Sequence, residues 1–410
     1  MSIIEINQNS RNFSFLALGV LLPFSAAAIS IFMILLVVLT LLDKSSYKKL
    51  YDNFKKPLFQ SFGLFFILHM VGFYWLEVDP INWHKSWMIW IIPILAVAVD
   101  SDTARKGVYA LIIGMALALL YVYYNIFNIW ETYIHGGFLE VTLPISRVAY
   151  NPFLALVIGL VLSLIFSGKI KNWRLFVAII FLISLIVNMF MIGGRAGQIG
   201  FIFIWFAISY FYFRGNASKL YIMVMTIVCI LIISWNASHA FRDRALEALD
   251  NLGSYSLHTK QASLEDLINS SVGLRLHFNE HSLKLLADSP IIGYGTGSFE
   301  NVFSEYADQN DGQVIKTSNP HSNHMLILVQ FGFVGFLIYL NIYYQQIRAV
   351  NSMPMHYEFR GAALVLPIFF IVINSYDSYI WGHHTQALFA YITAILYRSD
   401  VYTPQESSPQ

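Results

Sequence analysis

Apolar runs of about the length of a membrane span recur from one end of this 410-residue chain to the other. A helix of about 20 apolar residues crosses the ~30 Å hydrocarbon core of a bilayer and satisfies its own backbone hydrogen bonds there. The sequence therefore predicts an all-α, polytopic integral membrane protein. Twelve runs are present, near residues 13–22, 25–42, 58–76, 87–99, 108–130, 151–167, 175–192, 198–213, 220–236, 325–345, 361–375 and 385–397.

The first two of these runs form one continuous apolar stretch, "FSFLALGVLLPFSAAAISIFMILLVVLTLL", at residues 13–42. A stretch of this length is long for a single span. We therefore expect a break at Pro23, which gives about twelve transmembrane helices. Without that break the count is eleven.

The composition agrees with a membrane protein and excludes some partners. Hydrophobic residues make up 57% of the chain and charged residues 12%, about half the charged fraction of a typical soluble protein. The net charge of +1 argues against nucleic acid as a partner. The single cysteine, Cys229, lies inside an apolar run, which excludes a disulfide framework and a cysteine metal site.

Basic residues predict the orientation. With the amino terminus inside, the short outer loops hold only three of them, Lys85, Arg147 and Arg195. The inner segments hold sixteen: Arg11, Lys44, Lys48, Lys49, Lys55, Lys56, Arg105, Lys106, Lys169, Lys171, Arg174, Arg214, Lys219, Arg348, Arg360 and Arg398. Because inner loops of membrane proteins are enriched in Lys and Arg, both termini are expected in the cytoplasm.

This orientation divides the chain into four parts. Residues 1–236 hold transmembrane helices one to nine, and 237–323 form a large, mostly helical loop domain on the outer side. Residues 324–397 hold helices ten to twelve, and 398–410 form a cytoplasmic tail.

Within the loop domain, "SVGLRLHFNEHSLKLLA" (271–287) has the apolar spacing of an amphipathic helix. The stretch "DSPIIGYGTGSF" then ends this helix with a proline and three glycines. Its glycines suggest a dinucleotide-binding loop or a P-loop, but no Lys-Ser/Thr pair follows them and no strand–helix unit surrounds them. We interpret it as a backbone turn that shapes a pocket.

Two arginines on the outer side are candidates for binding an anion. Arg195 lies in the turn "GGRAG", on the side that positive charge avoids, and the glycines let the backbone approach a ligand. The alternative is an arginine that reaches lipid headgroups. Arg275, on the loop helix, could clamp a phosphate with its planar guanidinium or pair with Glu280 or Asp288 at the surface.

Two histidines, His321 and His324, stand at the outer boundary of the tenth span in "NPHSNHMLILVQFGFVG". Ionisable groups at such a boundary are costly unless they pair, line a wet cavity or perform chemistry. They share the outer side with Asp377 in "NSYDSYIWGHH" and with both arginines. The set predicts a base beside an anion clamp at the membrane surface.

The stretch "HFNEH", from His277 to His281, matches the H-x-x-E-H pattern of inverted zinc peptidases. No helix with a third ligand follows at a suitable place. A zinc site needs at least three protein ligands, so we expect no metal here.

Three pieces of the chain resemble the O-antigen ligase family of bacterial inner membranes, within the superfamily that also holds O-antigen polymerases of the Wzy type. His321 and Ser322 are followed after nine residues by Gly332 and then Gly335, the family's histidine pattern. The family's Ser-x-x-x-Arg helix and proline–glycine turn match at Ser271, Arg275, Pro290, Gly293, Gly295, Gly297 and Phe299. Its arginine turn matches "GGRAG", although the family often has Ser-Arg there, and a late aspartate matches Asp377 loosely.

The resemblance implies a glycosyltransferase of lipopolysaccharide biosynthesis. It would transfer glycan from undecaprenyl diphosphate to a sugar hydroxyl of lipid A–core, on the periplasmic face of the inner membrane. His321 takes the place of the catalytic histidine, and Arg195 and Arg275 suit the diphosphate. Asp377, His324 and Arg147 would be supporting residues. The family is not thought to need a metal or another cofactor.

Three alternatives remain open. A Wzy-type polymerase or a related lipid-linked glycan transferase would share the histidine and arginine chemistry and differ in the acceptor. A transporter or lipid-linked-sugar flippase would place its charges within the spans, whereas this chain places them at the outer boundary. The zinc peptidase comes last.

Overall fold

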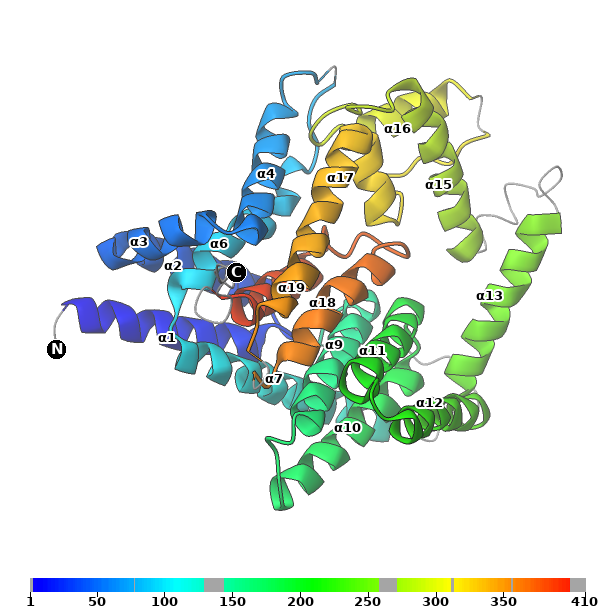
Figure 1. Ribbon diagram of the computed structural model, residues 1–410. Helices are drawn as coiled ribbons and strands as arrows, with labels where there is room; N and C mark the ends of the chain where they lie inside the picture. The colour runs from blue at the N-terminus through cyan, green and yellow to red at the C-terminus, as the bar shows by residue number, and fades with distance from the viewer. Residues whose placement is uncertain are drawn as a thin grey trace, which may run out of the picture.

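The computed structural model describes residues 3–76, 78–128, 144–257, 271–310, 313–354 and 357–398. In this part of the chain the protein is built from helices, without a β-strand, so the predicted all-α class is confirmed. The helices, drawn in Figure 1, are α1 (Ile3–Leu21), α2 (Ala26–Leu42), α3 (Lys44–Phe54), α4 (Pro57–Val71), η1 (Trp83–Ser86), α5 (Trp87–Trp90), α6 (Ile92–Ala98), α7 (Ser101–Asn128), α9 (Arg147–Phe166), α10 (Trp173–Ile192), α11 (Arg195–Phe213), α12 (Ala217–Ala237), α13 (His239–Leu257), α15 (Ser271–Asp288), α16 (Phe299–Asp308), α17 (Asn323–Asn351), α18 (Arg360–Ile373) and α19 (His383–Leu396).

Every predicted apolar run coincides with a helix or a broken pair of helices, but these differ in length. In the described residues, six helices are long and apolar enough to cross a membrane: α7, α9, α10, α11, α12 and α17. The pair α2 and α3, bent by 101°, would add a seventh. The chain is thus a multi-pass membrane protein, and the count of about twelve spans stays a prediction.

The expected break at Pro23 is present. Helix α1 ends at Leu21 and α2 begins at Ala26, and Ser25 caps α2 by accepting a hydrogen bond from the Ala28 N–H. Residues 13–42 therefore form two helices. Whether each of them crosses the bilayer is part of the same prediction as the span count.

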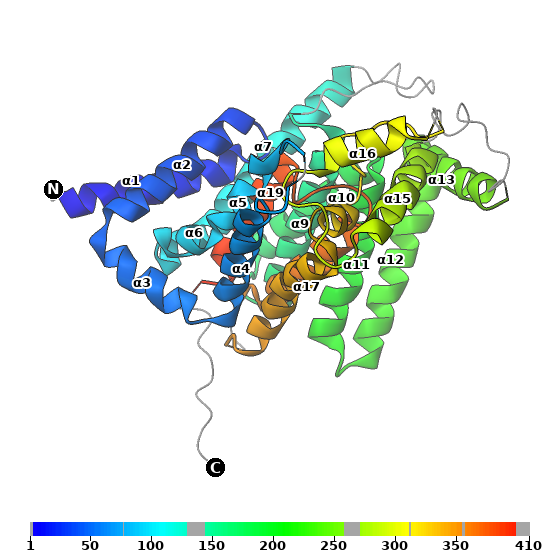
Figure 2. The same ribbon diagram turned by 90° about the horizontal axis from the view of Figure 1, so that it is seen from above.

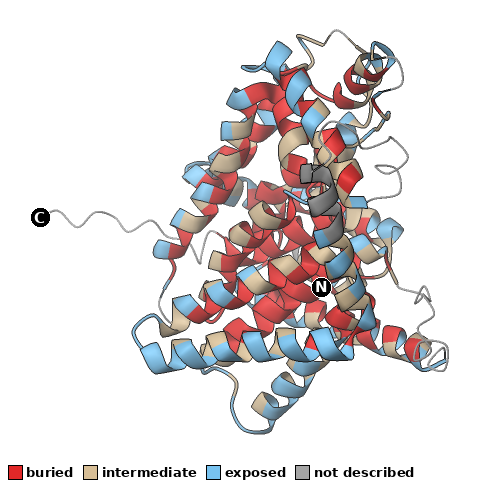
Figure 3. Cartoon of the chain, turned by 90° about the vertical axis from the view of Figure 1, so that its right-hand side faces the viewer, coloured by how far each residue is buried: buried red, intermediate tan, exposed pale blue. Residues whose placement is uncertain are grey.

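Helix α9 is the centre of the bundle, between α10, α11 and α18 (Figure 1). Nearly every residue from Ala149 to Leu164 is buried, because apolar side chains cover its whole circumference. The outer helices α10 and α12 instead expose large apolar side chains, and Figure 3 shows the buried residues gathered inside this exposed shell. An exposed apolar belt of this kind is the surface that lipid covers.

The predicted loop segment 237–323 contributes α13, α15 and α16 in its described part. The helix expected at 271–287 is α15, and the proline–glycine stretch separates it from α16. Seen from above in Figure 2, α15 and α16 lie beside the start of α17. The domain boundaries remain predictions, and the tail beyond Arg398 lies outside the described residues.

The glycines of this stretch fit a turn that lies directly against other backbone segments. Gly293, Gly295 and Gly297 have φ angles of +67°, +94° and +72°, which favour glycine. A Cβ at Gly293 would meet the backbone of α17 at Val329, and one at Gly295 would meet the carbonyl oxygen of Gly72 at the end of α4. The pattern thus attaches the loop to α4 and α17.

Helix α17 breaks where this turn meets it. Gly332 has φ +59° and ψ −163°, a conformation essentially restricted to glycine. The Phe333 and Val334 N–H groups, freed from the helix, donate to the carbonyl oxygens of Pro290 (2.8 Å) and Ile291 (3.1 Å). The glycine that follows the histidine in the family pattern therefore has a structural role here.

We expect Gly332→Ala to prevent stable folding. The φ/ψ pair alone costs a non-glycine residue about 1–3 kcal/mol, and the added Cβ would also clash with the Ile291 backbone. The matched control is Gly215→Ala, where a Cβ meets nothing within 4 Å. The two variants should be compared by detergent-solubilised yield and unfolding temperature. Equal values would mean that the junction between the turn and α17 is not needed for folding.

Candidate functional site

His321 lies immediately before α17, in a backbone conformation that few non-glycine residues adopt. Its φ is +52°, in the left-handed region. Its N–H donates to the Oδ1 of Asn319 (3.0 Å), which also accepts the Ser378 hydroxyl (2.7 Å). Ser322 caps α17 by accepting from the Met325 N–H. Unusual backbone conformations of this kind concentrate at functional sites.

The carboxylate of Asp377 joins His321 to Arg275. Its Oδ1 lies 3.2 Å from His321 Nδ1, and its Oδ2 lies 3.5 Å from Arg275 Nη2. Because an ionised carboxylate only accepts hydrogen bonds, the proton is assigned to Nδ1, which leaves Nε2 with its lone pair. Burial would raise the pKa of Asp377, but His321, the Ser378 N–H and Arg275 together hold that pKa below its usual value. Asp377 is therefore ionised at neutral pH.

The two predicted arginines come from different helices. Arg275, on α15, donates to the hydroxyl of Ser271 one turn earlier (3.1 Å), and its buried Nε has no hydrogen-bond partner among the described residues. Arg195, the first residue of α11, has its Nη2 2.7 Å from Glu247 Oε2 on α13, an ion pair that lacks hydrogen-bond alignment. Both guanidinium groups thus keep N–H donors for another anion.

These arginines line a common cavity of about 530 Å³, which we call the arginine chamber. The volume lies within the range of about 300–1,000 Å³ usual for ligand sites. Four of its lining residues are arginines: Arg147, Arg195, Arg244 and Arg275. Residues Asn151, Asn279 and Tyr379 also line it. Two carboxylates of the described residues form ion pairs with these arginines: Glu247 with Arg195 and Arg244, and Asp377 with Arg275.

Asn151 is a site residue that sequence reasoning missed. It lines the arginine chamber, is 1% exposed, and neither atom of its amide has a hydrogen-bond partner among the described residues. A Cβ at Gly194 or Gly197 would clash with it, so the glycines of "GGRAG" make room for this amide. The available signal was an amide beside a proline in an otherwise apolar span, since buried polar groups in spans are expensive and often functional.

A second cavity, of about 650 Å³, lies on the other side of Asp377; we call it the histidine chamber. His321 and Asp377 line it, and its other lining residues include His84, Lys85, Trp87, Trp381, His383 and His384. Val148 and Tyr379 line both chambers, which are therefore neighbours. The ion pair of Arg275 and Asp377 connects the arginine chamber to the histidine chamber.

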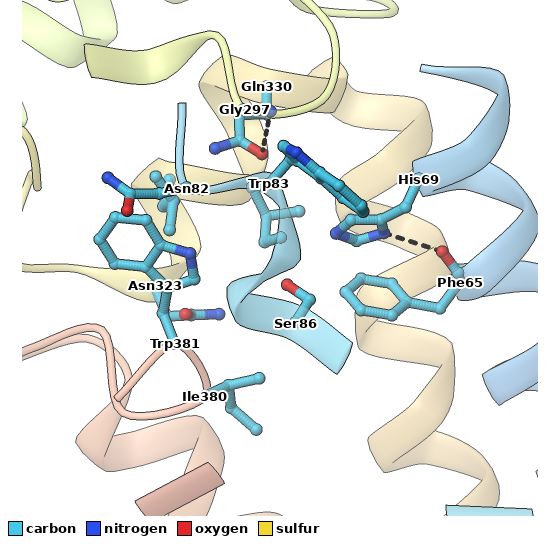
Figure 4. Close-up of a pocket in the computed structure, with 12 residues that line it drawn as sticks. Phe65, His69, Asn82, Trp83, Ser86, Gly297, Asn323, Gln330, Ile380 and Trp381 are labelled. Carbon is cyan, nitrogen blue, oxygen red and sulfur yellow. Dashed lines mark hydrogen bonds between the residues drawn. The ribbon is translucent and has the colours of Figure 1, made fainter. Parts of the chain in front are cut away.

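A much smaller hollow, of about 10 Å³, lies next to the histidine chamber and shares Trp381 with it (Figure 4). This is about the room needed by one water molecule. His69 lies in its wall with Nδ1 bonded to the Phe65 carbonyl oxygen (2.9 Å), and Gln330 accepts the Gly297 N–H (3.4 Å). The bond between Gly297 and Gln330 holds the glycine turn against α17.

Two predicted or considered groups do not reach either chamber. The His324 side chain, on α17, faces α18, and its Nε2 lies 2.9 Å from the Ile371 carbonyl oxygen. His277 accepts the Ile315 N–H (3.3 Å), and His281 lies 3.1 Å from the Tyr306 hydroxyl. Burial lowers the pKa of His281 to about 4. In the described residues no three His, Cys, Asp or Glu side chains gather as a metal site.

Comparison with known families agrees with the sequence resemblance. A family model, Wzy_C, described as O-antigen ligase, matches residues 178–340. The resemblance to the O-antigen ligase family is thereby confirmed, and the chain carries the family's domain over this segment. The match includes Arg195, Arg275 and His321, whereas Arg147 and Asp377 lie outside it. No curated protein matches the chain.

Proposed function

We propose that this protein is an O-antigen ligase, which transfers glycan from undecaprenyl diphosphate to a sugar hydroxyl of lipid A–core. The observation that carries the proposal is the bridge from His321 through Asp377 to Arg275, between a cavity rich in arginine and a second cavity. A base and an anion site in direct contact are what transfer from a diphosphate carrier to a hydroxyl requires.

The arginine chamber is the site for the donor's diphosphate. Guanidinium groups bind phosphate oxygens through paired N–H donors, and Arg195 and Arg275 have donors without aligned partners. Arg147 supports them, since it lines the chamber and has no ion-pair partner among the described residues. Asn151 adds an amide donor at the same wall. Charge builds on the leaving diphosphate in the transition state, where such preorganised donors contribute most.

His321 is the general base. Its Nε2 accepts the proton of the acceptor hydroxyl as the hydroxyl oxygen bonds to the sugar carbon that carries the diphosphate. The bond from that carbon to the phosphate oxygen breaks, and its electron pair leaves with undecaprenyl diphosphate. Asp377 fixes the imidazole tautomer through Nδ1 and stabilises the imidazolium that forms. His324, which bonds to the Ile371 carbonyl oxygen, supports His321 only indirectly. No step uses a metal, so a chelator is expected to leave transfer unchanged.

We place the protein in the bacterial inner membrane, with about twelve transmembrane helices, cytoplasmic termini and both chambers open to the periplasm. The shorter apolar helices would complete the spans that length alone leaves at six or seven. The strong excess of Lys and Arg on the inner segments supports this orientation.

The orientation predicts which introduced cysteines a membrane-impermeant maleimide reaches. In a Cys229→Ser background, Gln309→Cys, exposed after α16, should react in cells permeable only at the outer membrane. Lys171→Cys, exposed between α9 and α10, should react only after lysis of the inner membrane. The reverse pattern would place both chambers on the cytoplasmic side and contradict the proposed donor and acceptor.

The main alternative is a Wzy-type O-antigen polymerase, and deletion of the gene distinguishes the two. Loss of a ligase should leave fully polymerised glycan on its lipid carrier, unattached to lipid A–core. Single, unpolymerised repeats would instead identify a polymerase. The intact protein should restore attachment, and the His321→Ala protein should not. A second assay, with purified protein and both substrates, distinguishes the ligase from a flippase. A flippase would form no new glycosidic bond in it.

A further inference from the structure

The position of His321 determines from which side the acceptor must come. Its imidazole lines the histidine chamber and does not line the arginine chamber. Asp377 holds Nδ1, so the ring has only Nε2 left for a substrate. If the diphosphate occupies the arginine chamber, the hydroxyl that loses its proton must approach through the histidine chamber.

One wall of the histidine chamber carries a cation, Lys85, that pairs with no carboxylate of the described residues. The Lys85 ammonium lies 3.8 Å from the centroid of the Trp381 ring, and Glu300 acts on it only as a more distant charge. Burial lowers the pKa of Lys85, and the charge of Glu300 partly opposes this effect. A half-buried ammonium that rests on an indole is well placed to receive an anion from the chamber.

The first turn of α19 forms another part of the wall. Residues 382–386 line the chamber, and α19 begins at His383 without a side-chain cap on its first N–H groups. The start of a helix carries partial positive charge and N–H donors that suit phosphate. Two ring nitrogens of this turn, His383 Nδ1 and His384 Nε2, are buried and have no hydrogen-bond partner among the described residues.

The same chamber also has features suited to a sugar. Trp87 and Trp381 line it, and an indole face packs well against the C–H face of a pyranose ring. A neutral imidazole both donates and accepts, as sugar hydroxyls do. With about 650 Å³, the chamber has the volume of a typical ligand site.

Resting on the proposed function, we propose that the histidine chamber is the acceptor subsite, and that Lys85 and the first turn of α19 recognise a phosphate group on the acceptor saccharide. The tryptophans hold the sugar ring, and the free hydroxyl reaches Nε2 of His321. The enzyme then has two phosphate-binding regions, one for each substrate, on opposite sides of Asp377.

Binding of defined probes tests the subsite without the reaction. The probes are a synthetic disaccharide with one phosphate and the same disaccharide without it, added to purified full-length protein saturated with inorganic pyrophosphate. We expect the phosphorylated probe to bind at least about tenfold more tightly, the usual effect of a charge-assisted contact. Lys85→Gln should remove this preference, and Lys85→Arg should retain it. The control Lys284→Gln, whose exposed ammonium pairs with Glu280 on α15, should behave as the wild type.

Transfer assays separate this inference from the proposed function. Lys85→Gln should raise the KM for lipid A–core about tenfold and leave the KM for the lipid-linked donor unchanged. Equal probe binding by the wild type and Lys85→Gln would overturn the subsite, as would a change confined to the donor KM. If the wild type bound the phosphorylated probe through Lys85 but transferred no glycan, the ligase proposal would be wrong and the phosphate subsite would stand.

Discussion

His321→Ala should abolish glycan attachment while the protein still binds pyrophosphate. Loss of a general base typically costs about 10²–10⁴-fold in rate. The arginine chamber does not include the His321 side chain, so anion binding should survive. Transfer and pyrophosphate binding are measured on the same purified protein at matched concentration.

The matched control is His324→Ala, three residues further along. That side chain bonds to the Ile371 carbonyl oxygen between two helices and lines neither chamber, so its loss should be mild. An inactive His324→Ala beside an active His321→Ala would move the base one turn into α17 and contradict the geometry described above.

The same assignment predicts the effect of pH on transfer by the wild type. Activity should fall on acidification below neutral, because an imidazolium cannot accept the acceptor's proton. Asp377 is not the source of this loss, since its lowered pKa keeps it ionised until the pH falls below its ordinary value of 3.8. A rate that stays constant from pH 8 to about 5, where histidines ordinarily change charge, would exclude a histidine base.

Substitutions of the two clamp arginines should have the second largest effect. Arg275→Ala removes N–H groups that we propose to bind the diphosphate, and it also removes the partner of Asp377. Losing one preorganised hydrogen-bond donor of this kind costs about 10²–10³-fold in kcat. Arg195→Lys keeps the charge but loses the planar fork, so a large loss is expected there too. Both variants should also weaken pyrophosphate binding, which is read from the shift in unfolding temperature.

Arg242→Ala is the control for a lost arginine. Arg242 lies on α13 beside Arg244, but it contacts His239 and Asp243 and lines neither chamber. Full activity of both clamp variants would mean that Arg195 and Arg275 serve ion pairs or lipid headgroups instead of the donor. If Arg242→Ala lost as much activity as the Arg195 and Arg275 variants, the losses would reflect disturbed folding of α13 and not the loss of diphosphate contacts.

Much of the fold follows from local patterns in the sequence. Apolar periodicity predicted the helices, and Pro23 marked the break between α1 and α2 because proline removes a backbone hydrogen bond from a helix interior. The helical spacing at 271–287 likewise located α15. The number of spans could not be determined in the same way, because α4 and α18 are apolar helices shorter than the length that crosses a bilayer.

The site was only partly predictable, because it depends on contacts between distant segments. Sequence patterns selected His321, Arg275 and Asp377, but only the fold shows one carboxylate bridging the other two. The glycines of "GGRAG" were interpreted as room for a ligand, which stays a prediction; two of them, Gly194 and Gly197, also lie directly against Asn151. That pairing joins α9 to the start of α11, and no local pattern encodes it.

The backbone bonds between the glycine turn and α17 also restrict how the site can open. The turn follows α15 directly, and its carbonyl groups at 290 and 291 hold the broken section of α17. His321 and Arg275 therefore lie on elements that the turn joins through backbone hydrogen bonds. Arg195, at the start of α11, is held differently, by an ion pair with Glu247 on α13. Under the proposed function, we expect the lipid-linked donor to enter and leave between these two regions, beside the ion pair of Arg195 and Glu247.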